Sequence, residues 1–396
     1  MNPFIFTILL CFGTLNAAFC ALIIGLLRRD KNWPRWIGFA LAGWCLLMMA
    51  IAVFQIAAPI GWRPALRRWF YFPIAVQMAW NLLVLEGGFL VAAAVAITAP
   101  IVRALRRRNR TAEKIIAPTP AGLSRRRFLY LLAAGAAPAT ATAMGVHGTL
   151  SRYDLRQRGY VVPIAGLPPE LEGFTIAHVS DLHSGVFCGP QRLANIVAAT
   201  NDLNADLIAI TGDVINNSMA EFPDALAAIR RLRSRHGIYL CEGNHDLIPD
   251  DDQFATACAA SGLNLLREQS ATVLVENRRL ILGGVPWTGR HFPVQPEIVS
   301  RLFPARQEGD VRLLLAHHPH FFDSAQSADL VLAGHTHGGQ VMLGPLGLGP
   351  LFFKYWSGLY RRGRTAMIVS NGAGDWFPCR IGAPAEVGLV RLTRAA

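Results

Sequence analysis

The sequence predicts two parts of different fold class, an α-helical membrane domain followed by an α/β domain. Two observations support this division. The chain has 396 residues, of which 52% are hydrophobic and only 16% charged, and its long uncharged stretches lie in the first 146 residues. From about Tyr160 onward, short apolar runs rich in β-branched residues alternate with helical segments, which is the pattern of β-α-β units.

Four stretches of the N-terminal part are predicted to be transmembrane helices, because about 20 helical residues cross a bilayer core of about 30 Å. They are residues 3–27, 36–60, 74–102 and 128–146, of which the last is the weakest because it is short and contains a proline. Tryptophan residues gather at the segment ends, which is typical of an interfacial aromatic belt. We therefore expect a transmembrane domain at 1–146, a linker at 147–159 and a second domain at 160–396.

The formal net charge of +12 is carried by the N-terminal part. Residues 1–127 hold 16 Lys and Arg against three acidic residues, a balance of +13, whereas the remainder holds 22 against 23, a balance of −1. A near-neutral second domain argues against a nucleic-acid-binding protein. The basic residues lie mainly in the loop after the first span and the loop before the fourth. The positive-inside rule places these loops in the cytoplasm, so residues 147–396 are predicted to be extracytoplasmic.

A twin-arginine-like motif precedes the fourth predicted span. Residues 124–129 read SRRRFL and are followed by an apolar stretch, as in export signals where paired arginines precede an apolar core. This interpretation adds the export machinery as a partner. The alternative is a positive-inside flank of the fourth span, since the motif follows three other spans. The small-residue run 139–143 also leaves open a cleavage that would release the second domain.

The second domain is predicted element by element from its apolar runs. Strands are expected at 174–180, 206–211, 238–241, 311–316, 329–333, 365–370 and 386–392, helices at 191–203 and 221–235, and a hairpin at 273–283. The alternation of strands with helices implies a largely parallel sheet.

Polar side chains follow five of these strands at the point where each one ends. They are Asp181, His183, Asp213, Asn244, His245, Asp246, His317, His335 and His337. Ligands of open α/β sheets gather where the carboxyl ends of strands converge, so we expect these side chains to lie together. Carboxylates combined with imidazoles suit Mn, Fe or Zn better than Ca or Mg, whose sites are mostly all-oxygen. The sequence therefore predicts a metal centre.

At these positions the sequence resembles the calcineurin-like metallophosphoesterases. The blocks that match in order are Asp181-Leu182-His183, Gly212-Asp213, Gly243-Asn244-His245-Asp246, His317 within residues 315–319, and Gly334-His335-Thr336-His337. The extended block 334–340 and the segment 354–360 are similar to the branch of membrane-associated and exported bacterial phosphodiesterases. This resemblance implies that the protein lies in the inner membrane of a bacterium. The resemblance implies a four-layer αββα sandwich with two mixed sheets for residues 160–396.

The resemblance also implies a role for each residue. The first metal would be held by Asp181, His183 and His337, the second by Asn244, His317 and His335, with Asp213 bridging the two. The adjacent His318 is an alternative to His317, although the His-x-Pro spacing of the family favours His317. His245 would face the substrate phosphate, and Asp246 would orient it.

Two divalent ions (Mn, Fe or Zn) about 3.5–4 Å apart can share a hydroxide and stabilise both the attacking and the leaving oxygen of an in-line displacement at phosphorus. The predicted function is therefore a membrane-anchored phosphoesterase that cleaves a phosphodiester or phosphomonoester, with an envelope or lipid-linked substrate. Membrane lipid is the other expected partner. One alternative is a UDP-acylglucosamine pyrophosphatase of lipid A synthesis, with its active site in the cytoplasm. An alternative of another class is a non-catalytic membrane receptor or scaffold.

Overall fold

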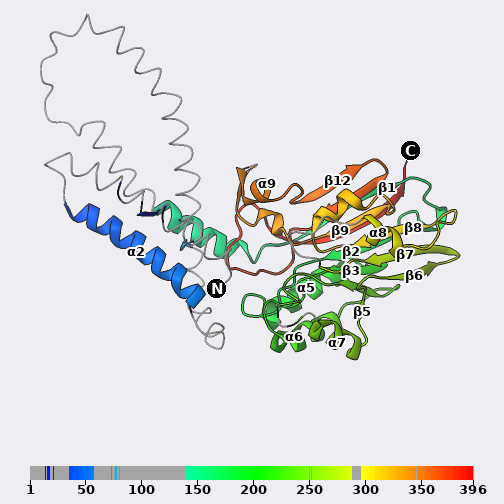
Figure 1. Cartoon of the computed structure of the whole chain (residues 1–396), viewed down its shortest axis with the longest axis horizontal. Helices are drawn as coiled ribbons and strands as arrows, with labels where there is room; N and C mark the ends of the chain where they lie inside the picture. Colours follow the sequence, from blue (N-terminus) through cyan, green and yellow to red (C-terminus); the bar gives the residue numbers. More distant parts are fainter. Residues whose placement is uncertain are drawn as a thin grey trace, which may run out of the picture. The chain divides into compact units, whose positions relative to one another are not determined.

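The computed structural model describes residues 35–57, 139–248, 250, 252–287, 296–344 and 346–395, together with single positions at 14, 16, 17, 21, 73, 76, 77 and 80. The chain divides into two compact units, residues 1–147 and residues 148–396. Figure 1 shows the described elements of each unit, with labels on many of them.

The described part of the first unit contains one long helix, α2 (Arg35–Ala57), which coincides with most of the second predicted span. Trp80 is fully buried, donates its indole N–H to Asn16 Oδ1 at 2.6 Å and meets Trp44 edge-on at 5.9 Å. The other predicted spans, 3–27, 74–102 and the first part of 128–146, lie almost wholly outside the described residues. Across the residues that the structure describes, no helix was identified as both long enough and apolar enough to cross a membrane.

Two six-stranded sheets form the framework of the described part of the second unit (Figure 1). The first has the order β1 (Leu155–Ile164), β14 (Ala385–Arg394), β2 (Thr175–Val179), β3 (Leu207–Thr211), β4 (Ile238–Cys241), β5 (Asn264–Leu265). The second has the order β12 (Gly358–Arg362), β13 (Thr365–Val369), β9 (Leu330–Ala333), β8 (Val311–Leu315), β7 (Arg278–Gly284), β6 (Gln269–Val275). Both are mixed, because β14 runs antiparallel to β2, and β12 and β6 run antiparallel to their neighbours. The prediction of an α/β domain with two mixed sheets is confirmed.

Shorter elements complete the described part of this unit. The helices are α5 (Pro190–Asp202), α6 (Phe222–Ile229), α7 (Gln253–Ala260), α8 (Pro296–Leu302) and α9 (Leu348–Phe352). The 3₁₀ helices are η1 (Pro169–Leu171), η2 (Met219–Glu221), η3 (Pro319–Ser324) and η4 (His337–Gly339), and β10 (Met342–Leu343) pairs with β11 (Leu346–Gly347).

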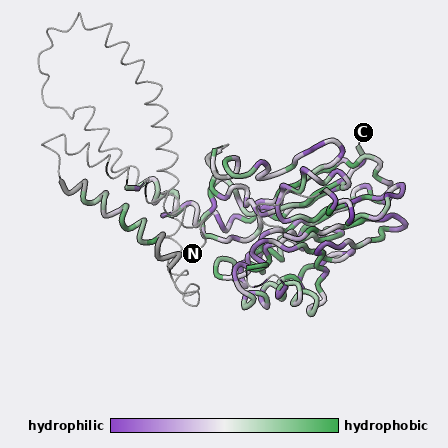
Figure 2. Tube along the Cα trace, viewed as in Figure 1, coloured by the Kyte–Doolittle hydropathy of each residue, from purple (hydrophilic) through white to green (hydrophobic). Residues whose placement is uncertain are grey.

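Successive residues of the central strands enter different apolar clusters, which shows that the sheets are covered on both faces. In β3, Leu207 packs in the cluster between the two sheets, whereas Ile208 packs in the cluster formed with α5, α6 and α7. In β8, Leu313 faces the first sheet and Leu314 faces the side of α8 and η3. Side chains of a strand alternate between its faces, so burial of both faces makes the run continuously apolar. Figure 2 shows hydrophobic residues along these strands.

Two predicted boundaries shift in the structure. The helix expected at 221–235 ends at Ile229, because Asn201 of α5 accepts from the Arg233 N–H and donates to the Arg231 carbonyl, bonds that replace helical ones. The linker expected at 147–159 is shorter, since β1 begins at Leu155 and pairs in parallel with β14.

Candidate metal centre

The nine predicted site residues follow the carboxyl ends of strands in both sheets. Asp181 and His183 follow β2, Asp213 follows β3, and residues 244–246 follow β4. His317 follows β8 of the second sheet, His335 follows β9, and His337 begins η4. The parallel strands therefore deliver all of these side chains to one edge of the sandwich.

Four of them form a first cluster of potential ligand atoms. His337 Nε2 lies 3.2 Å from Asp181 Oδ1 and 3.1 Å from His183 Nε2. His183 Nε2 lies 3.9 Å from Asp181 Oδ1 and 3.5 Å from Asp213 Oδ2. All four side chains are buried.

A second cluster shares Asp213 with the first. His317 Nε2 lies 3.2 Å from Asp213 Oδ2 and 3.2 Å from Asn244 Oδ1. His335 Nδ1 lies 2.8 Å from the same Asn244 oxygen and 3.2 Å from His317 Nε2. Asp213 Oδ2 is thus close to both clusters. The ring of the neighbouring His318 lies 4.7 Å from that of His335, but its Nδ1 contacts the backbone N–H and the ring of His320.

These separations fit a pair of divalent cations. Ligands bound at about 2.0–2.2 Å around one ion are roughly 3.0–3.5 Å from each other, which are the edge lengths of an octahedron or tetrahedron of that size. The contacts between donor atoms run from 2.8 Å (His335 to Asn244) to 3.9 Å (His183 to Asp181). The donor set of imidazoles, carboxylates and one amide oxygen suits borderline cations such as Mn, Fe and Zn. The residues therefore support a divalent metal centre.

Electrostatics favour metal binding at both clusters. Burial lowers the pKa of His335 to about 3 and lowers that of His183 well below its usual range, so both rings are neutral at pH 7 and keep a lone pair for a cation. Burial opposes charge on His317, but Asp213 raises its pKa to about 9. The Asp213 carboxylate therefore stabilises a positive charge beside His317, and it would stabilise a bound cation in the same way. Burial also opposes ionisation of Asp213, but His317 and His245 hold its pKa well below the usual range.

The backbone at the site adopts an uncommon conformation. Nine described non-glycine residues have a positive φ, and five of them are predicted ligands: Asp181, His183, Asp213, His335 and His337. Glycines allow these loops to approach each other closely. A Cβ added to Gly334 would lie 1.9 Å from Ser180 Oγ and 2.3 Å from Asp181 Oδ2, and one added to Gly243 would lie 2.2 Å from Asp213 Oδ1. Gly334 and Gly243 of the sequence motifs are therefore required because a side chain at either position would clash.

His245 lies beside the two clusters. Its ring meets that of His183 edge-on with centroids 4.6 Å apart, and its Nδ1 contacts the Asn216 carbonyl at 2.5 Å. Because a carbonyl can only accept, Nδ1 carries a hydrogen and donates a hydrogen bond to this oxygen. The backbone N–H of His245 donates to Asp213 Oδ1 at 2.8 Å, so the carboxylate shared by the clusters also positions the His245 loop.

The hydrogen bonds of Asp246 correct its predicted role. We expected Asp246 to orient the His245 ring, but Asp246 Oδ1 accepts from the N–H groups of Val214 and Ile215, and Oδ2 from Gly243. Asp246 thus joins the loops after β3 and β4, while the Asn216 carbonyl orients His245. Burial and the nearby Asp213 raise the pKa of Asp246 to about 8.

A buried arginine behind the first cluster was missed by the sequence analysis. Arg380 is fully buried and its Nη2 lies 3.1 Å from His337 Nδ1. The same guanidinium bonds Asp375 Oδ1 at 2.5 Å and the carbonyls of four loop residues, 371, 372, 374 and 383. No local motif marks this residue, because its partners are brought to it only by the fold.

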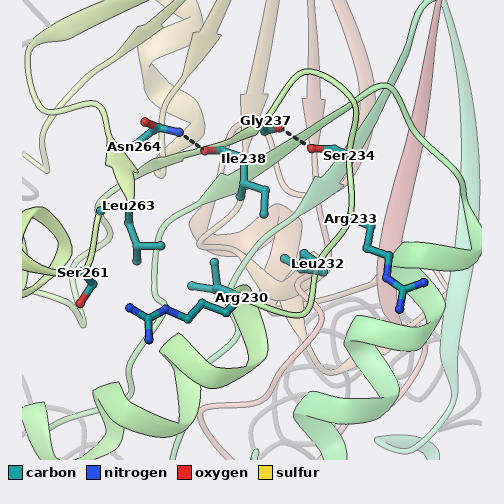
Figure 3. A pocket seen from close by; sticks show the side chains of 11 residues that line it. Arg230, Leu232, Arg233, Ser234, Gly237, Ile238, Ser261, Leu263 and Asn264 are labelled. Atoms are coloured by element: carbon teal, nitrogen blue, oxygen red, sulfur yellow. Dashed lines mark hydrogen bonds between the residues drawn. The ribbon is translucent and has the colours of Figure 1, made fainter.

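A pocket of about 490 Å³ lies elsewhere in the second unit. It is lined by residues 229–230, 232–234, 237–238 and 261–264, which include the first residue of β4 (Figure 3). Some of its polar groups form hydrogen bonds with one another. Ser234 donates to the Gly237 carbonyl, and Asn264 donates to the Ile238 carbonyl. None of the lining residues is a predicted site residue, so this pocket is separate from the metal centre.

The two mixed sheets and the clustered ligands of the second unit fit a metal-dependent phosphoric ester hydrolase. Residues 174–339 match the family model described as calcineurin-like phosphoesterase. The chain is 30% identical over 249 residues to a zebrafish (Danio rerio) transmembrane protein with metallophosphoesterase domain, covering 59% of this chain and 56% of that protein. It is 26% identical over 285 residues to phosphodiesterase YaeI of Escherichia coli, covering 68% of this chain and 99% of the other.

A third relative is the metallophosphoesterase YkuE of Bacillus subtilis, which is 27% identical over 290 residues, with 68% of this chain and 98% of YkuE covered. The chain spans 56% of the length of the zebrafish relative and 58% of that of two further curated relatives. Residues 174–339 are thus similar to the calcineurin-like metallophosphoesterases.

Proposed function

We propose that this protein is a membrane-anchored, two-metal phosphoesterase that hydrolyses a phosphodiester or phosphomonoester outside the cytoplasm. One observation carries the two-metal part. Asp213 Oδ2 lies 3.5 Å from a nitrogen of the first cluster and 3.2 Å from a nitrogen of the second, which is the position of a bridging carboxylate. We assign Asp181, His183 and His337 to one ion and Asn244, His317 and His335 to the other.

Bound cations would supply charge neutralisation at the phosphoryl oxygens and activation of water. The protein's own groups complete the chemistry. Because the Nδ1–H of His245 donates to the Asn216 carbonyl, Nε2 can donate to the leaving oxygen or to a phosphoryl oxygen when the ring is protonated on both nitrogens. The Asp213 carboxylate fixes this ring relative to both clusters through the His245 backbone N–H.

The activity is tested with the full chain purified in lipid nanodiscs and loaded with Mn. Bis-p-nitrophenyl phosphate and p-nitrophenyl phosphate report diesterase and monoesterase activity. Asp213→Ala is expected to lower kcat/KM more than about 100-fold and to lower the bound metal, since even residues that only support ligands contribute 10- to 100-fold. Asp154→Ala, at an exposed ion pair, is the matched control and should keep both. Metal-loaded protein that cleaves neither ester would overturn the proposal.

Membrane anchoring and an extracytoplasmic active site rest on the predicted spans and the charge of their loops. The name of the zebrafish relative, a transmembrane protein, supports the anchoring. Fusion of an alkaline phosphatase reporter after Ala396 tests the orientation. Reporter activity is expected, and a silent reporter would instead favour the cytoplasmic pyrophosphatase.

A further inference from the structure

Apolar residues border the second cluster, and others lie exposed nearby in the sequence, in β11 and α9. The outer members are large and strongly exposed: Leu346 by 63%, Leu351 by 72% and Phe352 by 67%. The inner members are the half-buried rings of Phe353 and Trp287. We refer to these five residues as the apolar strip.

The inner end of the apolar strip contacts the metal centre. The ring of Trp287 lies 5.1 Å from that of His335 and 5.7 Å from that of His317. Phe353 meets His335 edge-on at 5.7 Å. Both aromatic residues therefore border the ligands proposed for the second ion, where one side of a bound phosphoester would lie.

The outer end of the apolar strip packs against the turn that carries His335 and His337. Gly339 of η4 packs so closely on α9 that a Cβ there would lie 2.4 Å from the Gly349 N atom. Beyond α9, Thr336 donates its hydroxyl to the Trp356 carbonyl at 2.7 Å, and Lys354 pairs with Asp323 at 3.0 Å. The segment that carries the exposed leucines and phenylalanine is thus packed against the turn that carries His337.

We propose that the apolar strip binds an acyl chain of the substrate, so that the enzyme acts on a phosphoester of a lipid; this rests on the proposed function. Leu346, Leu351 and Phe352 offer no hydrogen-bonding side chain, so a sugar or nucleobase placed there would lose its contacts with water without replacement. A hydrocarbon chain instead gains from burial. Because the strip starts beside His335, a chain attached to the phosphoester can run along it while the phosphate stays at the cations.

The proposal is tested with p-nitrophenyl alkyl phosphodiesters whose alkyl chains have two to eight carbons. In the wild-type protein, kcat/KM is expected to rise by roughly two- to fourfold per methylene that contacts the strip. Leu351→Asp and Phe352→Asp should flatten this dependence. Leu274→Asp is the matched control, since Leu274 is a similarly exposed leucine, 64%, on strand β6. A rise with chain length that is equal in wild type and strip variants would overturn the proposal, as would no rise in the wild type.

A binding measurement separates this proposal from the proposed function. Fluorescently labelled dodecyl phosphate is titrated onto each metal-loaded protein, and polarisation gives Kd without hydrolysis. Kd is expected to rise at least tenfold in Phe352→Asp and to stay unchanged in Leu274→Asp. Tight, strip-dependent binding without hydrolysis of any ester would contradict the proposed function and support the acyl-chain site. Binding to phospholipid vesicles that depends on the strip, with no effect on the titration, would make the strip a bilayer contact and overturn the proposal.

Discussion

Replacing Asp375 with asparagine is expected to destabilise the second unit strongly. Asp375 is fully buried and contacts three arginines: Arg380 at 2.5 Å, Arg192 at 2.9 Å and Arg152 at 3.3 Å. The side chains of these arginines are exposed by only 0%, 10% and 3%. Asparagine keeps the size of the side chain but removes its negative charge, so three guanidinium groups would share no counter-charge at this position.

The magnitude follows from the burial. Removing one partner of a buried ion pair costs about 3–5 kcal/mol, because the remaining charge stays desolvated. In a domain of this size, 1 kcal/mol changes Tm by about 2–4 °C, so Tm is expected to fall by about 6–20 °C. His337 should also lose metal affinity, because Arg380, which contacts both Asp375 and His337, would no longer be fixed.

The assay is differential scanning calorimetry of the full chain with and without added Mn. Asp154→Asn is the control, since the Asp154–Arg156 pair is 47% and 62% exposed and should contribute less than about 1 kcal/mol. If Asp375→Asn lowers Tm no more than Asp154→Asn does, the buried cluster is not an important source of stability and the reasoning is refuted.

Three further predictions concern the site and the core. His245→Ala should lower kcat about 10²- to 10⁴-fold with metal content unchanged, because its ring is assigned to proton transfer; loss of metal instead would make it a ligand. Gly334→Ala should reduce bound metal, measured by mass spectrometry, since its Cβ would clash with Asp181; Gly159→Ala, where nothing lies within 4 Å, should not, and equal losses would contradict the steric argument. Burial opposes ionisation of Asp310, but Arg279 lowers its pKa, so its stabilising effect is present above about pH 4 and lost as pH falls. The difference in free energy of unfolding between wild type and Asp310→Asn, measured with urea, should therefore become smaller below pH 4. A difference that does not change with pH would refute this assignment of the pKa shift.

The central strands could be predicted from sequence because their two faces are both buried. β2, β3, β4, β8 and β9 each begin and end within one residue of the predicted apolar runs. In β1, by contrast, four of the first five residues are exposed, so no apolar run marks the strand. Its existence depends on the backbone of β14, more than 200 residues away, which sequence pattern cannot reveal.

The ligand residues could be found for a related reason. Each follows a recognisable strand and stands in a short motif with glycine or a second polar residue. Residues that support the ligands lack such signals. Asp246 was expected to serve His245 because the two are adjacent, whereas its bonds go to Val214, Ile215 and Gly243, which only the meeting of two loops brings within reach.

The loops that carry the ligands hold each other in an otherwise unfavourable conformation. A positive φ at a residue with a side chain costs of order 1 kcal/mol, and Asp181, His183, Asp213, His335 and His337 all have one. The backbone N–H of Asp181 donates to the Gly212 carbonyl at 3.0 Å and that of His183 to the Asp213 carbonyl at 2.8 Å. The Asp181 carboxylate in turn accepts from the His335 N–H at 3.1 Å. These bonds link loops of both sheets, so the fold itself fixes the ligand geometry and a cation needs to reorganise little on binding.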